Sequence, residues 1–274
     1  MRNKNIINMR KNTILILMLF FGTCISAQSI STDHEPEISV PGLYIGIESG
    51  IKTFNTFEKE HEFIRESASY YYGYSYRYSA LSLMSLSYYA SINAEYRMLD
   101  NHLWVSGGIS YSTMNASIAK YSGSDSHPDY FYVLLNQQDN ESYYYRISEL
   151  RFLSHYIGIP LDFNFAPITS KYFQLYGKIG MDLNFRVNTN KRATFYNEEM
   201  NSYEPEVLAL FEDPQNFYAL AGFGGGLQIG QKNKPNIRFE MDLLSFVLTP
   251  DALSLVEQNV AFGGNISFLI PLNK

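Results

Sequence analysis

Hydrophobic and polar residues alternate without interruption from Tyr172 to Val187, and Lys178, Asp182 and Arg186 all fall in the polar phase. Side chains of a β-strand point alternately to its two faces, so this segment is predicted to be a strand with one apolar and one polar face. It is longer than an average globular strand of about 5–6 residues and exceeds the about 9–11 tilted residues that cross a bilayer. Because a dry core does not accept unpaired charges, we expect lipid on one face and a polar lumen on the other.

The same alternation recurs along the chain and predicts eight strands. Their approximate ranges are 42–53, 79–98, 102–119, 149–165, 172–187, 216–230, 236–248 and 258–271. In the fourth of these, Pro160 lacks the N–H that a strand ladder needs, and we expect a β-bulge at this position.

The connections between the predicted strands differ in length. Those after the second, fourth and sixth strands are short, whereas 54–78, 120–148 and 188–215 are long loops. Short turns on one side and long loops on the other are typical of outer-membrane barrels, and an even strand number places both termini on the short-turn, periplasmic side. We therefore predict an all-β fold over residues 42–274: an eight-stranded antiparallel up-and-down transmembrane β-barrel with long extracellular loops.

The first 27 residues have the pattern of a secretory signal peptide. Four basic residues precede an apolar stretch, and Ser26-Ala27 supplies small residues before Gln28. Cleavage after Ala27 would remove Cys24, the one cysteine, which excludes a disulfide and a thiolate catalyst from the mature chain. It would leave residues 28–41 as a periplasmic spacer, and 17 Lys+Arg against 27 Asp+Glu, a net charge of −10. Such an acidic chain is not expected to bind nucleic acid.

Charged residues occupy the inward phase of most predicted strands, five of them positive and six negative. They are Glu48, Lys52, Glu95, Arg97, Asp162, Lys178, Asp182, Arg186, Arg238, Glu240 and Asp242. The interior of an eight-stranded barrel is just wide enough for its own side chains, and buried charges require partners. The near balance predicts a paired network that plugs the lumen, and the alternative is a narrow ion path.

Two further groups of residues suggest contacts outside the lumen. Tyr70, Tyr71, Tyr72, Tyr74 and Tyr76 continue to Tyr78 and predict either an aromatic girdle or a stacking platform for a glycan or protein partner. His155 lies in the lipid-facing phase, as in barrels that hydrolyse lipids with a His and a Ser on the outer wall. Ser154 points the other way on a strand, and no matching Ser and acid are evident, so we expect an interface histidine. The remaining histidines lack ligand spacing, and we predict no metal and no cofactor.

Several segments resemble the small outer-membrane β-barrel family of Bacteroidota that includes PorT-like proteins. They are the Ala27/Gln28 junction, "HYIGIPLDFNF" at 155–165, "YGKIGMDLNF" at 176–185, "GFGGGLQIG" at 222–230 and the final "ISFLIPL". The resemblance covers about 40–274 and describes architecture rather than chemistry, and the chain departs from it by ending in Leu272-Asn273-Lys274 instead of Phe. It implies a location in the outer membrane of a Gram-negative bacterium, with PorT-like members tied to protein secretion.

From these patterns we expect a non-enzymatic outer-membrane barrel with a plugged lumen. Its partners would be outer-membrane lipid around the wall and a protein or glycan at the extracellular loops, in a surface-binding or envelope-structural role. A PorT-like accessory role in secretion and an outer-membrane lipid hydrolase are the alternatives.

Overall fold

The computed structural model describes residues 42–59, 61, 63–65, 81–120, 130–138, 141–249 and 253–272. The predicted signal peptide, the spacer and the tyrosine run at 70–78 lie outside these residues.

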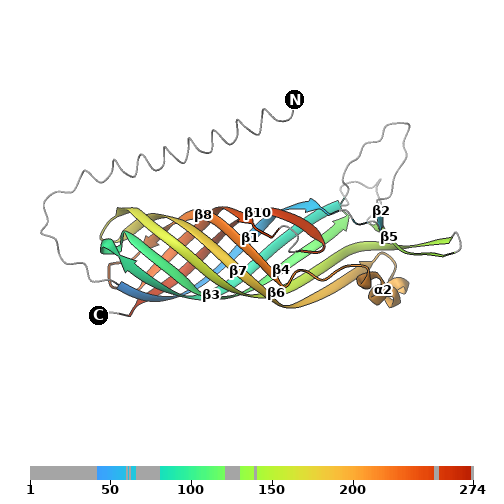
Figure 1. The fold of residues 1–274 in the computed structure, drawn as a ribbon, viewed down its shortest axis with the longest axis horizontal. Helices are drawn as coiled ribbons and strands as arrows, with labels where there is room; N and C mark the ends of the chain where they lie inside the picture. The colour runs from blue at the N-terminus through green and yellow to red at the C-terminus, as the bar shows by residue number, and fades with distance from the viewer. Residues whose placement is uncertain are drawn as a thin grey trace, which may run out of the picture.

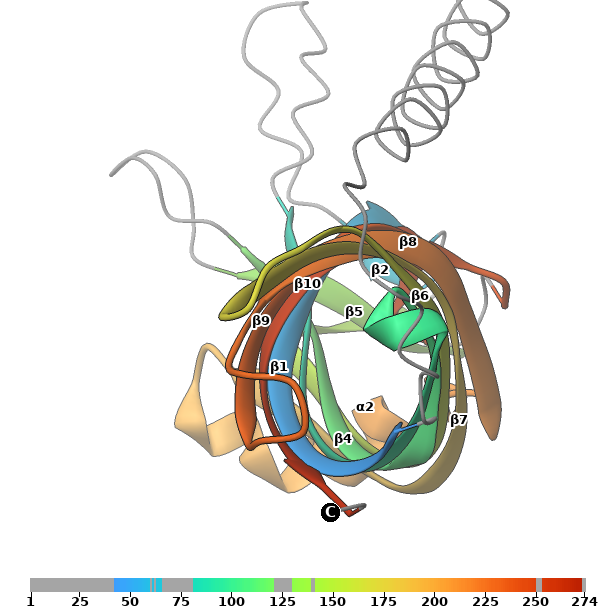
Figure 2. The ribbon, with the colours of Figure 1, turned by 90° about the vertical axis from the view of Figure 1, so that its left-hand side faces the viewer.

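Eight long antiparallel strands of the described chain close into a ring. They are β1 (Gly42–Glu58), β3 (Leu81–Met98), β4 (Leu103–Lys120), β6 (Glu141–Thr169), β7 (Phe173–Phe195), β8 (Phe217–Ile229), β9 (Asn236–Val247) and β10 (Val256–Pro271). Each pairs with its neighbours in the chain, β1 pairs with β10, and every pairing is antiparallel. Figures 1 and 2 show the barrel from the side and from the end that carries the C-terminus. The predicted up-and-down barrel of eight strands is confirmed.

Four strands, β1, β6, β7 and β10, extend clearly beyond the predicted ranges at the end opposite the termini. β6 has 29 residues and β7 has 23, and β5 (Phe131–Gln138) pairs with the first part of β6 inside what the sequence predicted as a loop. The two-residue β2 (Ile64–Arg65) pairs in turn with β5. The 3-10 helix η3 (Glu198–Tyr203) and helix α2 (Glu204–Ala209) follow β7 at the same end (Figure 1). These elements form an extension that continues the wall past the barrel mouth.

The opposite end carries tight connections. The 3-10 turn η2 (Leu99–Asn101) joins β3 to β4 through three consecutive residues with positive φ, which costs little for the Asp and Asn among them. Gly230, with φ of 148°, opens the turn from β8 to β9, where only glycine is unstrained. One end of the barrel therefore carries tight turns and the other carries the long extension, as the lengths of the predicted loops indicated.

Pro160 does not create the expected bulge. The register of β6 on β7 runs through Pro160↔Asp182 unbroken, with its three shifts elsewhere, and the register on β4 is the same on both sides of Pro160. On the β4 side, no pairing occurs between Gly107↔Leu161 and Ser110↔Gly158. The missing N–H is thus accommodated by a short gap in the ladder, without an inserted residue.

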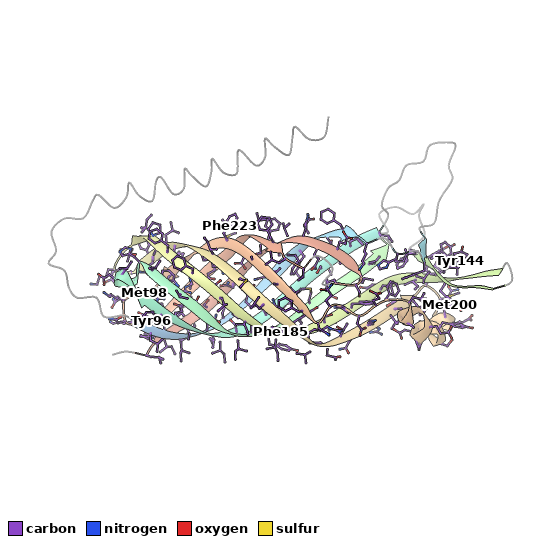
Figure 3. All side chains as sticks on the ribbon, viewed as in Figure 1. Tyr96, Met98, Tyr144, Phe185, Met200 and Phe223 are labelled. Carbon is purple, nitrogen blue, oxygen red and sulfur yellow. The ribbon has the colours of Figure 1, made fainter. Side chains whose placement is uncertain are left out.

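A belt of exposed apolar side chains encircles the barrel (Figure 3). It includes Ile47, Ile92, Ile109, Ile157, Ile179, Phe185, Phe223, Met241, Leu243, Ile266 and Phe268, contributed by all eight strands. A continuous apolar surface of this size is not stable in water, and it is the lipid-facing surface of a membrane-spanning barrel. Among the described residues, no helix is long and apolar enough to cross a membrane.

Candidate functional site

The lumen is filled by three layers of inward-facing side chains. The layer nearest the termini, the arginine–aromatic layer, contains Tyr44, Glu95, Arg97, Trp104, Tyr176, Gln228 and Arg238, all of which are buried. The middle layer, the central charge layer, contains Glu48, Lys52, Asp162, Lys178, Asp182, Glu240 and Asp242. The third, the apolar cap, closes the mouth toward the extension with Phe54, Met114, Phe152, Val207, Phe211, Leu220, Leu253 and Leu255.

In the arginine–aromatic layer, Glu95 binds two arginines at once. Its carboxylate accepts two hydrogen bonds from Arg238, at 2.5 and 2.9 Å, and one from Arg97 Nη2 at 3.0 Å. Gln228 Oε1 accepts a further bond from Arg97 at 2.7 Å. The fork of a guanidinium matches a carboxylate in two parallel bonds, and such charge-assisted bonds are about twice as strong as neutral ones. These bonds link β3, β8 and β9 across the barrel.

Aromatic rings enclose the same guanidinium groups. The Arg97 guanidinium lies 4.0 Å from the centre of the Tyr44 ring and 5.3 Å from that of Trp104. The Arg238 guanidinium lies 5.4 Å from the centre of the Trp104 ring and 5.2 Å from that of Tyr176, and these two rings pack edge to face with centroids 4.9 Å apart. Trp104 and Tyr44 are fully buried, so this layer leaves no exposed path along their faces.

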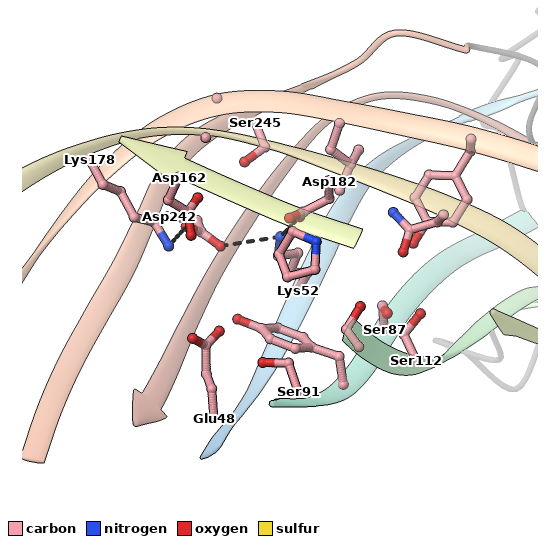
Figure 4. A pocket seen from close by; sticks show the side chains of 18 residues that line it. Glu48, Lys52, Ser87, Ser91, Ser112, Asp162, Lys178, Asp182, Asp242 and Ser245 are labelled. Atoms are coloured by element: carbon pink, nitrogen blue, oxygen red, sulfur yellow. Dashed lines mark hydrogen bonds and ion pairs between the residues drawn. The ribbon is translucent and has the colours of Figure 1, made fainter. Parts of the chain in front are cut away.

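Glu240 joins this layer to the central charge layer. It accepts a hydrogen bond from the Tyr176 hydroxyl on one oxygen and an ion pair from Lys178 Nζ, at 2.8 Å, on the other. Lys178 also contacts Asp242 at 3.0 Å, and Lys52 lies between Asp182 and Asp242 (Figure 4). The two lysines are therefore shared among three carboxylates.

Two acids of the central layer have no cationic partner within ion-pair distance in the described chain. Glu48 accepts hydrogen bonds from Asn93 at 3.1 Å and from Ser267 at 3.4 Å, and Asp162 forms neither an ion pair nor a side-chain hydrogen bond there. Both line a cavity of about 50 Å³. Its other lining groups include the lysines and several serines, and it has room for roughly four waters. The layer thus carries five acids and two bases around a polar cavity.

The apolar cap combines strand residues with residues of the loops. Phe152 on β6 packs edge to face against Phe211, which follows α2, with ring centroids 5.8 Å apart. Val207, Leu253 and Leu255, which belong to no barrel strand, are at most 2% exposed. The loops of the extension therefore fold against the inner wall and cover the lumen with apolar surface.

The structure places ten of the eleven predicted lumen residues in the arginine–aromatic layer and the central charge layer. Arg186 lies apart, near the mouth, where it faces Asp213 at 3.6 Å and donates to Asn216 Oδ1 at 2.7 Å. The sequence interpretation missed the enclosing aromatics and the apolar cap. Trp104 stood in the inward phase of its strand, which was the available signal for an aromatic inside the lumen.

His155 lies on the outer wall, in the outward-facing phase of β6 between Leu153 and Ile157. Its Nδ1 is 2.7 Å from the Tyr111 hydroxyl, and Ser154 points inward, where its hydroxyl contacts Thr189 at 2.9 Å. Within the described chain, no serine or carboxylate hydrogen-bonds to this imidazole. Among the described residues, no group of three or more His, Cys, Asp or Glu side chains is arranged so that it could hold a metal ion.

No family model matches this chain, and no curated protein matches it. Among solved structures, it is similar to the outer membrane protein OprG from Pseudomonas aeruginosa, at 8% identity over 84% of this chain and 96% of that one, with a TM-score of 0.42. It is also similar to the translocator domain of the autotransporter NalP from Neisseria meningitidis (10% identity, 94% and 97% coverage, TM-score 0.26). An outer membrane channel from Pseudomonas putida F1 shows 8% identity, 88% and 100% coverage and a TM-score of 0.24. At these scores, fold and function rest on the chain's own geometry.

Proposed function

We propose that this protein is a non-conducting outer-membrane barrel of a Gram-negative bacterium that acts through its extracellular surface. The observation that carries the proposal is the closed lumen: buried Trp104 and Arg97 block it near the termini, and Phe211 and Leu255 cover its mouth. A pore would need a continuous polar path, and the central cavity lies between these two seals. The apolar belt and the contrast between short turns and long loops support the membrane location.

Conductance of the mature protein in planar bilayers tests the closed lumen. We expect no steady current from the wild type. An opened variant, R97A/W104A/F211A/L255A, removes bulk from both seals and leaves Glu95 paired with Arg238, and it should conduct. Heat-modifiable migration on gels would establish that both proteins are folded barrels. Steady wild-type channels would overturn the proposal, and a silent, folded variant would show that other residues form the seals.

The extension offers a surface through which such a barrel could bind a partner. Tyr130, Tyr132, Tyr144 and Tyr196 form a tyrosine cluster with ring centroids 4.7 to 6.1 Å apart, and Arg146 stacks on Tyr130 at 5.1 Å. Tyr144 and Tyr196 are about half exposed, at 46% and 51%. Exposed aromatic rings beside an arginine are typical of binding hot spots, and their faces suit sugar rings or a protein surface.

Capture from intact membranes and a glycan array tests this surface. The double variant Y144A/Y196A should lose most binding to a captured glycan or protein, because each ring supplies contact area that an alanine does not. Tyr172→Ala is the matched control, since Tyr172 is equally exposed (54%) but lies at the opposite end. Equal binding by Y144A/Y196A and by the wild type would contradict a role for the cluster.

The other predicted roles stay predictions. For a PorT-like secretion accessory, deletion of the gene should leave exported cargo in the periplasm, and normal secretion would count against it. For a lipid hydrolase, His155 would need a nucleophile and an orienting acid within reach, and among the described residues it has the Tyr111 hydroxyl but no carboxylate as a hydrogen-bond partner.

A further inference from the structure

Two arginines face each other on the outer wall above the apolar belt. Arg151 on β6 and Arg192 on β7 are direct cross-strand partners, and both are exposed. Their chain neighbours Phe152 and Lys191 point inward, where the Lys191 ammonium lies over the Phe152 ring, so the arginines point away from the lumen. Like charges directly opposite on a sheet destabilise it, so folding alone does not account for this pair.

Neither arginine has an acidic partner among the residues that the structure describes. Within the described chain, neither forms an ion pair, and Glu149 on the same strand forms none with them. The cations of the lumen, by contrast, lie against carboxylates: Lys52, Arg97, Lys178 and Arg238 each have at least one. The arginine pair therefore presents two uncompensated positive charges.

The Arg151 side chain is oriented by its surroundings. Its Nε donates to Asn115 Oδ1 on β4 at 2.8 Å, which leaves the two terminal amino groups of the guanidinium available. Asn188 and Asn190 lie on the same face of β7 below Arg192 and add amide donors. A fixed guanidinium with free terminal donors beside a second one is suited to phosphate oxygens.

The position of Arg151 and Arg192 along the barrel axis determines which part of the membrane they contact. The last apolar side chain in the outward phase of β6 below Arg151 is Leu153, and Arg151 lies two residues farther along the strand. At about 3.3 Å per residue and a strand tilt of about 40°, this places Arg151 about 5 Å above that apolar residue. That is the zone of lipid headgroups and of the sugars attached to them, within reach of a long arginine side chain.

From the unpaired charges, their orientation and their height, we propose that Arg151 and Arg192 bind the phosphate groups of a glycolipid headgroup in the outer leaflet. This inference rests on the proposed membrane location and does not depend on the closed lumen. It assigns the lipid contact to one side of the barrel, the wall formed by β4, β6 and β7.

Native mass spectrometry of the mature protein in a zwitterionic detergent tests this site. The probes are bis-phosphorylated lipid A, the same lipid with its phosphates removed, and inorganic phosphate as competitor. We expect the double variant R151Q/R192Q to bind phosphorylated lipid A at least about tenfold more weakly than the wild type. Dephosphorylated lipid should bind both proteins equally. The control K171Q/K234Q removes the same charge at the opposite end and should bind as the wild type does.

Three outcomes of the lipid-binding measurement would overturn the proposal. Equal affinity of R151Q/R192Q and the wild type for phosphorylated lipid A would overturn the proposal. So would an equal loss in K171Q/K234Q, which would indicate attraction by net charge alone. Full competition by millimolar inorganic phosphate would assign the pair to a free anion and also overturn the lipid site. The single variant R192Q relieves the like-charge contact, so it should fold at least as well as the wild type while binding the lipid more weakly.

Discussion

Glu95 is the residue on which the arginine–aromatic layer depends. It is 2% exposed and pairs with two arginines that are themselves almost fully buried. A buried ion pair contributes little net stability, because desolvation offsets the attraction, but removing one partner leaves an uncompensated charge. Here the loss would leave two cations, Arg97 and Arg238, close together with Gln228 as a shared neutral acceptor.

Replacing Glu95 by Gln should therefore destabilise the barrel by about 3–5 kcal/mol, the usual effect of breaking a buried pair. Urea-induced unfolding in lipid vesicles, followed by Trp104 fluorescence, would measure it. Asp100→Asn is the matched control: it breaks an exposed pair with Lys232 and should cost less than about 1 kcal/mol. Similar losses in the two variants would contradict the role given to Glu95.

At the scale of elements, the segment between β7 and β8 is held to the wall by polar contacts as well as by the apolar cap. Lys191 Nζ donates to the Phe211 carbonyl and pairs with Asp213, each at 2.6 Å. The Glu204 carboxylate accepts from the Ala193 amide at 2.9 Å. The hydrogen bond from Lys191 lowers the pKa of Asp213 below its ordinary value of 3.8.

The sign of that shift gives a pH dependence. Because the pKa of Asp213 is lowered in the folded protein, its contribution to docking of the segment is complete above pH 3.8 and is lost as the pH falls through the lowered pKa. The contribution should be less than about 1 kcal/mol, since Asp213 is 62% exposed. Amide chemical shifts of residues 207–213 in Asp213→Asn at neutral pH should match those of the acidified wild type. Glu212→Gln should leave them in place, and an equal change there would refute the assignment.

The barrel elements were predictable because each crosses between lipid and a filled lumen, which imposes strict alternation. Ile157, Ile159 and Leu161 on one phase and Asp162 on the other show this pattern directly. The extension was not predictable in the same way. Its β5 and the start of β6 lie beyond the lipid, so both faces admit polar and aromatic residues and the period of two carries no hydrophobic signal.

The site was predictable in composition but not in arrangement. Inward charges follow from strand phase, yet the pairing of Glu95 with Arg238 joins residues 143 positions apart, and strand tilt and register decide it. The apolar cap depends on Val207 and Leu255, which lie in connections without periodicity. Strand phase also gives no information on the height of each charge in the lumen, so the collection of acids in the central charge layer could not be predicted.

At the scale of the whole molecule, the lumen holds two arginines and one acid near the termini and an excess of acids at its centre. Arg97 and Arg238 are balanced by Glu95 and a share of Glu240, whereas Glu48 and Asp162 add charge beyond what Lys52 and Lys178 neutralise. The wild-type seals hide this excess from solution. Once the seals are removed, the field of the central layer would act on any ion that enters.

The opened variant should therefore prefer cations. In a tenfold gradient of KCl, its reversal potential should have the sign of K⁺ permeation, because an acidic constriction attracts cations and repels Cl⁻. Adding Glu48→Gln and Asp162→Asn, which removes the two carboxylates without an ion-paired base in the described chain, should bring the reversal potential close to zero. Adding Asp213→Asn instead alters an acid outside the lumen layers and should leave the selectivity nearly unchanged. Anion preference in the opened variant would contradict the charge distribution on which this expectation rests.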